Sequence, residues 1–226
     1  MSLRLTLLLI LVCLVCASPP AEARDDRPPP EPGVWELFSR FGEMEESIRE
    51  GKWQEAARGA NDLEGRFAAL GERLRPPVAA ATLEKFVSTL RTIRAGLATR
   101  NREQLELPML LLQHLLLDIM EPFAYPAPPA LLVARLWVDE AGEYLEGNNP
   151  NGVAREMAEL QGLRLRISEG FQAGEDGDAR AAAFFAAVSR VQQAIRLRKT
   201  EQATEGLATL RSLLPTPAPE EEKHPR

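Results

Sequence analysis

The residues that can bind a metal ion or act as a nucleophile are few in this chain. It contains two histidines, His114 and His224, and two cysteines, Cys13 and Cys16. A structural zinc site needs four Cys or His ligands, and both cysteines lie in the apolar stretch at the N-terminus. We therefore expect no metal site and no thiol chemistry in the folded part of the protein.

Enzyme motifs that depend on histidine or glycine are missing as well. A di-iron helical bundle uses Glu-x-x-His pairs on facing helices, whereas this chain offers one such pair, Glu221 with His224, in its acidic tail. No motif ties a serine to His114, the histidine that a Ser-His-Asp triad would need. No glycine-rich phosphate-binding loop is found. We therefore expect a non-enzymatic protein without catalytic residues.

Acidic side chains recur on one helical face. Glu43, Glu46 and Glu50 follow helical spacing. Such a row can bind a cation, although it is more often a solvated surface. His114 precedes Asp118 by four residues, the spacing at which two side chains on a helix meet. We expect His114 to be solvated or half-exposed, with Asp118 as its hydrogen-bond or ion-pair partner.

Met44 and His114 are the candidate ligands for a haem. A four-helix bundle with a methionine on its first helix and a histidine on its fourth resembles cytochrome b562 in outline, which implies a haem held without covalent bonds. At 100° per residue, however, His114 points about 160° away from Leu112, which faces the core. We therefore expect no cofactor. The alternative is a carrier of haem or another small molecule, of the cytochrome b562 or cytochrome c′ type.

The N-terminus has the features of a secretory signal peptide over residues 1–23. A positive charge precedes an apolar stretch from Leu5 to Cys16, and Ala21-Glu22-Ala23 matches a cleavage site. We expect export to the periplasm or the extracellular space. The alternative is a lipid anchor on Cys16, which Val15 disfavours because lipoprotein signals usually carry a small residue there.

The net charge argues against nucleic acid and anionic membranes as partners, and the length of the apolar stretches argues against a membrane-spanning helix. The chain carries a formal net charge of −6, which argues against binding to nucleic acid or to an anionic membrane surface. Beyond the signal peptide, the most apolar stretch is Leu107–Met120. It is shorter than the roughly 20 apolar residues of a membrane span and is interrupted by Gln113, His114 and Asp118. We expect no transmembrane helix after signal cleavage.

The rest of the chain is predicted to be helical between two proline-rich segments. These are a spacer at residues 24–33 and a disordered acidic tail at residues 215–226. Between them apolar residues recur every three or four positions, and no sustained alternation typical of strands is found. Eight helices can be placed in this way, with first apolar residues Val34, Trp53, Leu83, Leu107, Leu131, Val153, Phe184 and Ala203.

The helices fall into two similar halves. A proline-rich linker at residues 122–129 separates residues 34–121 from residues 130–214. A shift of about 97 to 100 residues aligns the apolar positions of four helices in the same order, which indicates an internal duplication. We predict an all-α fold of two tandem, internally duplicated up-and-down four-helix bundles.

A helical-hairpin array is the alternative fold. The segment Gly51-Lys52-Trp53-Gln54-Glu55-Ala56 resembles the middle turn of a tetratricopeptide repeat. The expected hairpin turns, marked by Gly51, Arg100, Gly147 and Arg198, recur about every 49 residues, whereas that family has a repeat of about 34 residues.

The helix over Leu107–Met120 is apolar nearly all round. Leu110 and Leu117 lie on the side of His114, away from core positions such as Leu112. A helix of this kind is buried on two sides, so we expect it to pack into its own bundle and also against the second half or another protomer.

Two tryptophans are further candidates for binding. Trp35 and Trp137 would line a hydrophobic groove, or else be buried in the core. Together these features predict an exported, non-enzymatic binding or scaffold module. Its protein partner would contact Leu110, His114 and Leu117, or enter the cleft between the halves.

Overall fold

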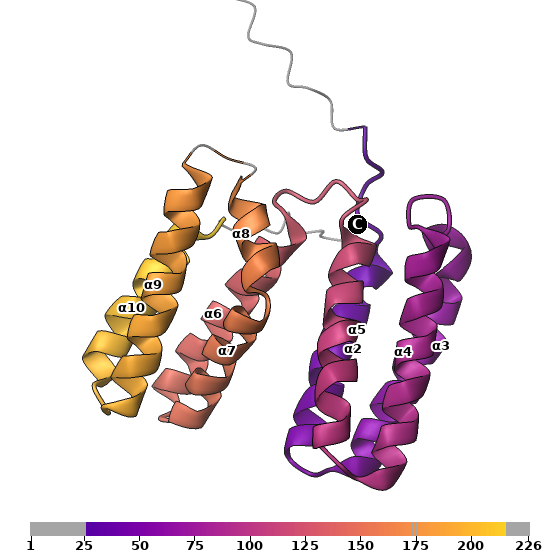
Figure 1. Cartoon of the computed structure of the whole chain (residues 1–226), viewed down its shortest axis with the longest axis horizontal. Helices are drawn as coiled ribbons and strands as arrows, with labels where there is room; N and C mark the ends of the chain where they lie inside the picture. The colour runs from indigo at the N-terminus through magenta and orange to yellow at the C-terminus, as the bar shows by residue number, and fades with distance from the viewer. Residues whose placement is uncertain (1–25, 173, 175, 216–226) are drawn as a thin grey trace, which may run out of the picture.

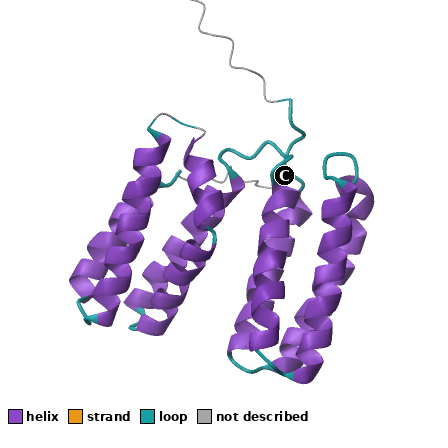
Figure 2. Cartoon of the chain, viewed as in Figure 1, coloured by secondary structure: helices purple, strands orange, loops and turns teal. Residues whose placement is uncertain are grey.

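The structure, a computed structural model, describes residues 26–172, 174 and 176–215, and every regular element in these residues is a helix (Figures 1 and 2). The all-α prediction is confirmed. The proposed signal peptide with its two cysteines, and the tail from residue 216 with His224, lie outside the described residues. The helices are α2 (Pro32–Arg49), α3 (Trp53–Leu74), α4 (Ala80–Thr99), α5 (Glu103–Met120), α6 (Pro129–Glu146), α7 (Pro150–Gly162), α8 (Arg164–Gln172), α9 (Gly177–Arg196) and α10 (Thr200–Leu213).

The described residues contain nine helices, so the predicted number of eight is wrong. The sixth predicted helix is divided into α7 and α8 at Leu163, whose backbone has φ −93° and ψ 16°. Gly162, which precedes the break, is a poor helix former. The apolar side chains expected on both sides of the break are nevertheless buried, among them Met157 and Ile167. The apolar spacing therefore predicted which residues are buried but not where the helix ends.

The helix contacts form two groups, which lie side by side in Figure 1. In the first group, α2 and α4 each pack against both α3 and α5. In the second group, α6 and α9 each pack against both α7 and α10, and α8 adds contacts to α6 and α9. These are called the first and second helix groups below.

Four hairpin turns join antiparallel helices, and each contains a residue with left-handed backbone. These residues are Gly51, Arg100, Asn148 and Arg198, which recur about every 49 residues, at or next to the predicted turn positions. Only Gly51 has a residue type that adopts positive φ without steric cost. The turn after α2 has the hydrogen bonds of a Schellman motif, with Lys52 N donating to Ser47 O over 2.8 Å. The turns after α6 and α9 repeat the same pattern of three bonds.

Large apolar side chains fill the inside of each helix group. In the first, Phe86 of α4 is completely buried and stacks on Phe67 of α3, with 4.2 Å between ring centroids. In the second, the ring of Phe184 lies 5.6 Å from that of Phe171 and 5.2 Å from that of Phe185. Burying one such side chain contributes about 1.5–3 kcal/mol.

The described part of the spacer is attached to the linker between the helix groups. Ala124 N donates to Pro28 O over 2.8 Å, and the Arg27 guanidinium donates to Glu121 O over 3.4 Å. Helix α2 starts at Pro32, inside the segment predicted as spacer, because proline fits the first turn of a helix. Within the described residues, no helix has the length and hydropathy that a membrane span requires.

Candidate functional site

A cleft of about 390 Å³ lies between the two helix groups. Helix α2 forms one wall with side chains that recur every three or four residues from Trp35 to Arg49. Helices α6 and α7 form the other wall, from Leu136 to Tyr144 and from Arg155 to Glu159. We call it the inter-group cleft. It has an aromatic part and a charged part.

The aromatic part contains both tryptophans considered from the sequence. Trp35 stacks on Phe38 with 6.1 Å between ring centroids, and Phe38 contacts Trp137 at 6.4 Å. The two tryptophans therefore lie in one cleft although they belong to different helix groups. Trp137 is 7% exposed and mainly packs in the core, whereas Trp35 is 38% exposed and offers its surface to a ligand or partner.

The charged part is organised by Arg155 of α7. Its guanidinium bonds Glu46 of α2 over 2.8 Å, Glu156 over 2.5 Å and the Tyr144 hydroxyl of α6 over 2.5 Å. Arg49 of α2 pairs with the same Glu46 at 3.1 Å. Glu46 belongs to the carboxylate row predicted on the first helix, and its role is to join the two helix groups.

Burial raises the pKa of three carboxyls in this charged part. The pKa of Glu45 rises to about 7, first because the group is buried and second because Glu159 lies nearby. Burial also raises the pKa of Glu156 to about 7, despite its bond to Arg155, and it raises the pKa of Glu140. The cleft can therefore change its charge around neutral pH. Among the described residues, no group of His, Cys, Asp and Glu side chains is arranged to hold a metal ion.

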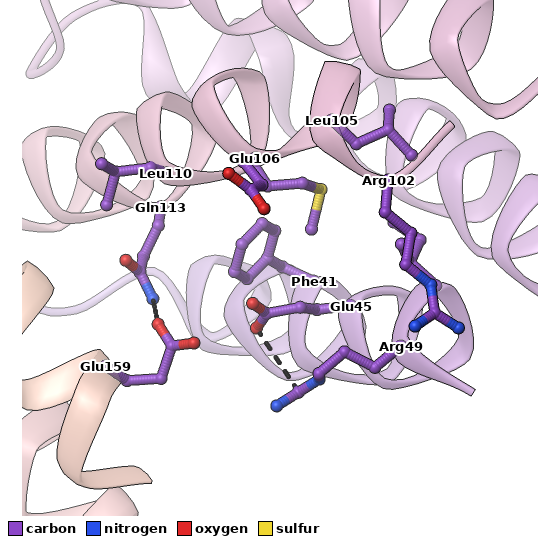
Figure 3. Close-up of a pocket in the computed structure, with 11 residues that line it drawn as sticks. Phe41, Glu45, Arg49, Arg102, Leu105, Glu106, Leu110, Gln113 and Glu159 are labelled. Carbon is purple, nitrogen blue, oxygen red and sulfur yellow. Dashed lines mark hydrogen bonds and ion pairs between the residues drawn. The ribbon is translucent and has the colours of Figure 1, made fainter. Parts of the chain in front are cut away.

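A second cavity of about 310 Å³ lies next to the cleft, between α2 and α5, with Glu159 of α7 at its edge (Figure 3). We call it the α2–α5 pocket. Gln113 of α5 is 2% exposed and donates its amide N–H to Glu159 over 3.3 Å, while its Oε1 has no hydrogen-bond partner. Arg49 also lines this pocket, and its Nε and Nη1 are buried without a partner.

The two candidate haem ligands face different neighbours. Met44 is completely buried and packs toward Gly59 of α3. His114 is half-buried, and its pKa is lowered by burial and by the charge of Arg166 in α8, against the opposing effect of Asp118. His114 is half-buried as expected, but Asp118, the expected hydrogen-bond or ion-pair partner of His114, pairs with Arg166 instead.

The side of α5 that carries Leu110, His114 and Leu117 faces α7 and α8 of the same chain. Leu110 lies next to Gly162 at the end of α7, and Asp118 forms an ion pair with Arg166 of α8. Leu117 is only 1% exposed. In this arrangement Leu117 presents almost no surface to another chain, because its own chain covers it. Leu110 retains exposed surface.

Most residues of the charged part were not predicted from the sequence, namely Glu45, Arg49, Glu140, Arg155, Glu156 and Glu159. The sequence position of one of them, Glu156, could have indicated that it is buried. Glu156 falls between Val153 and Leu160 at the three-four spacing of the buried face of α7. A charged residue at such a position is buried with a partner, and Glu156 has Arg155.

The inter-group cleft and the α2–α5 pocket are thus cavities in which polar groups meet across the helix groups, and a third cavity of about 510 Å³ contains the Arg166–Glu121 pair. Comparisons of the chain with protein-family models, with curated proteins and with solved structures find no match in any of the three.

Proposed function

We propose that the chain is an exported, non-enzymatic binding or scaffold module that holds a protein partner in the inter-group cleft. The observation that carries this proposal is Trp35, a large aromatic side chain that is exposed at the edge of a cleft with further aromatic groups behind it. Tryptophan is among the residues that contribute most to protein interfaces, because its large ring is buried when a partner binds.

The charge of the cleft favours a basic partner surface. Six carboxyl groups line the cleft, Glu43, Glu45, Glu46, Glu140, Glu156 and Glu159, against the two arginines Arg49 and Arg155, and burial raises the pKa of three of the six. Part of this negative charge is neutralised within the chain, and Glu43, which pairs with Arg40 over 2.6 Å, lies at the exposed margin of the cleft. A partner with lysine or arginine around an apolar centre would complement this arrangement.

Export is part of the proposal and rests on the sequence. The positive charge, the apolar stretch and the Ala21-Glu22-Ala23 site together have the order of a secretory signal peptide. A chain cleaved after Ala23 would fold outside the cytoplasm, where a protein without cysteine has no disulfides to form.

We also propose that the two helix groups are duplicated four-helix bundles, each made of two hairpins. The recurrence of the left-handed turn residue about every 49 residues supports this history. The turns after α2, α6 and α9 share three backbone hydrogen bonds although their sequences, Glu-Gly-Lys, Gly-Asn-Asn and Leu-Arg-Lys, differ. Schellman turns of this kind end many helices, and the turn after α4 has only the Arg100 N to Leu97 O bond, so the proposal rests on the regular spacing of the turns.

Site-specific photocrosslinking tests the proposed cleft. The photoreactive residue p-benzoylphenylalanine would replace Trp35, with the same replacement at Leu165, an exposed apolar residue of α8 outside the cleft, as the control. Cells that naturally produce the protein would be irradiated, and adducts analysed by mass spectrometry. We expect one predominant protein adduct from position 35 that Glu43→Lys weakens. Equal adducts from both positions, or none from position 35, would contradict the proposal.

A further inference from the structure

The α2–α5 pocket combines polar groups that lack partners with a continuous apolar wall. Phe41, Ile48, Leu105, Met109 and Leu110 form the apolar wall. The polar groups are Gln113 and the carboxylates Glu45, Glu106 and Glu159, together with the guanidinium groups of Arg49 and Arg102. Figure 3 shows the Gln113–Glu159 pair and Arg102 at opposite sides of the pocket, with Phe41 and Glu45 between them.

The side of the pocket at Gln113 is suited to a hydrogen-bond donor with positive charge. The Gln113 amide donates to Glu159, which directs its oxygen away from that bond and leaves the oxygen unpaired. Glu159 contributes a negative charge at the same place. A buried acceptor without a partner costs free energy, and an ammonium group supplies both donors and the matching charge.

The guanidinium of Arg49, which also lines the pocket, offers the opposite chemistry. Its Nη2 lies 3.1 Å from Glu46 and 3.8 Å from Glu45, whereas its Nε and Nη1 are buried without an acceptor. These two unpaired donors lie on different sides of the guanidinium, since Nε points in the same direction as Nη2, so each can donate a single hydrogen bond to a carboxylate oxygen. Arg102 adds a second positive charge across the pocket.

We propose that the α2–α5 pocket binds a free α-amino acid with an apolar side chain. Its ammonium group would bond Gln113 Oε1 and Glu159, and its carboxylate would bond Arg49. Its side chain would lie on the apolar wall formed by Phe41, Met109 and their neighbours. A cavity of about 310 Å³ falls at the small end of the usual range for ligand sites, which suits a molecule of this size.

Access to the pocket requires small side-chain movements. The unpaired atoms of Gln113 and Arg49 have almost no exposed surface, so both side chains must turn toward the ligand. Turning them loosens the Gln113–Glu159 and Arg49–Glu46 contacts, and hydrogen bonds to the ligand would replace what is lost. Because Glu159 belongs to the second helix group, the ligand would also bridge the two groups.

Titration of the purified full chain with L-leucine tests the proposal. Binding would be followed by calorimetry and by the NMR signals of the Gln113 side-chain amide. Two truncated ligands are the controls: leucinamide, which lacks the carboxylate, and 4-methylpentanoate, which lacks the ammonium group. We expect saturable binding of leucine and at least about tenfold weaker binding of either control. No binding of leucine, or equal binding of a truncated ligand, would overturn the proposal.

Substitutions then test which residues of the pocket contact the ligand. Glu159→Gln and Arg49→Gln should each weaken leucine binding by about tenfold or more, because each removes one charged contact. The matched control is Glu84→Gln, which removes a carboxylate from an exposed position on α4 outside the pocket and should leave binding unchanged. Circular dichroism would establish that each variant is folded. Unchanged affinity in both folded pocket variants would refute the assignment, while the crosslinking at Trp35 would still test the proposed function independently.

Discussion

The packing inside each helix group differs in kind from the packing between the groups. Inside the first group, apolar side chains such as Phe86 and Leu90 are buried against one another. Between the groups, the polar contacts include charged and amide pairs, among them Arg155 with Glu46, Gln113 with Glu159, and Arg166 with Asp118. The apolar core continues across the boundary, for example where Phe38 meets Trp137, but polar groups surround it.

Because of this difference, the packing inside each group should respond less to pH and salt than the contacts between the groups. Apolar burial within a group is insensitive to pH and salt, whereas ion pairs and buried carboxyls at the boundary depend on both. Among the described residues, three of the four buried polar side-chain atoms without partners, on Gln113 and Arg49, also lie at the boundary, and the fourth is the Tyr125 hydroxyl in the linker. We infer that the boundary is where the chain can rearrange at least cost, and both proposed binding sites are located there.

The largest expected effect comes from the core of one helix group. Phe86→Ala removes a completely buried ring that stacks on Phe67, so it should lower the free energy of unfolding by about 3–5 kcal/mol. Urea denaturation followed by circular dichroism measures this loss. Leu107→Ala, at an exposed position on α5, is the control and should change little. A loss below about 1 kcal/mol for Phe86→Ala would contradict the assignment of this residue to a tightly packed core.

A charge placed at the boundary should have the next largest effect. Leu117 is 1% exposed on the side of α5 that faces the second group, so Leu117→Asp buries a carboxylate without a partner. The chain can relieve this cost by separating the groups, and we expect a loss of about 3 kcal/mol with a larger radius of gyration. Small-angle scattering and thermal melting measure the two changes.

Leu107→Asp is the matched control for this substitution. It introduces the same charge on the same helix, at an exposed position. An unchanged melting curve and sedimentation profile for Leu117→Asp would show that Leu117 does not contribute to docking of the helix groups.

The carboxyls at the boundary should make stability depend on pH. The pKa of Glu45 is raised in the folded chain to about 7 from an ordinary value of 4.5 by burial and by Glu159, with Glu156 acting in the same direction and Arg49 opposing it. The folded state therefore holds a proton that the unfolded state has released. Its stabilising effect is complete below about pH 4.5 and is lost as the pH rises to about 7.

Glu45→Gln should remove part of this dependence, because glutamine resembles the protonated carboxyl. We expect the variant to be more stable than the natural chain at pH 8, by on the order of 1–2 kcal/mol, and about equally stable at pH 5. Thermal melting at the two pH values measures the difference, and Glu84→Gln on the exposed surface of α4 is the control. A natural chain whose melting temperature rises from pH 5 to pH 8 would contradict this sign.

The helical core could be predicted from the sequence because apolar spacing reports burial directly. Positions such as Phe86, Ile93 and Val188, chosen from their periodicity, are all completely buried. The break at Leu163 could not be predicted, since the same spacing continues through Val153, Leu160 and Ile167 on both sides of it. Local backbone geometry at a helix end depends on packing that the apolar pattern does not encode.

The candidate sites were largely hidden from the sequence because they combine residues of different helix groups. Glu46 and Arg155 are far apart in the chain, and nothing in their local spacing predicts that they meet. From residue type, Trp35 and Trp137 were expected to line a groove or to be buried in the core. Trp137 is buried, and both border the inter-group cleft. Which residues meet across the boundary depends on the relative position of the helix groups, and the apolar spacing of the sequence does not predict that position.

The smallest expected effects compare an ion pair at the boundary with one inside a group. Arg166 of α8 is largely buried and pairs with Asp118 and Glu121 of the first group, whereas Arg94 of α4 pairs with Glu64 of α3 within one group at a more exposed position. We expect Arg166→Gln to cost about 1 kcal/mol and Arg94→Gln less, since exposed pairs contribute about 0–1 kcal/mol. Melting curves at low and high salt measure both.

The dependence of stability on salt distinguishes a boundary held by ion pairs from one held by the apolar core alone. Added salt weakens exposed pairs, so it should reduce the already small difference between Arg94→Gln and the natural chain. If the boundary is held by charge, Arg166→Gln should also remove part of the natural chain's own loss of stability in salt. Equal salt dependence in the natural chain and Arg166→Gln would mean that the continuous apolar core alone holds the helix groups together. The boundary would then differ from the group interiors in composition but not in what stabilises it.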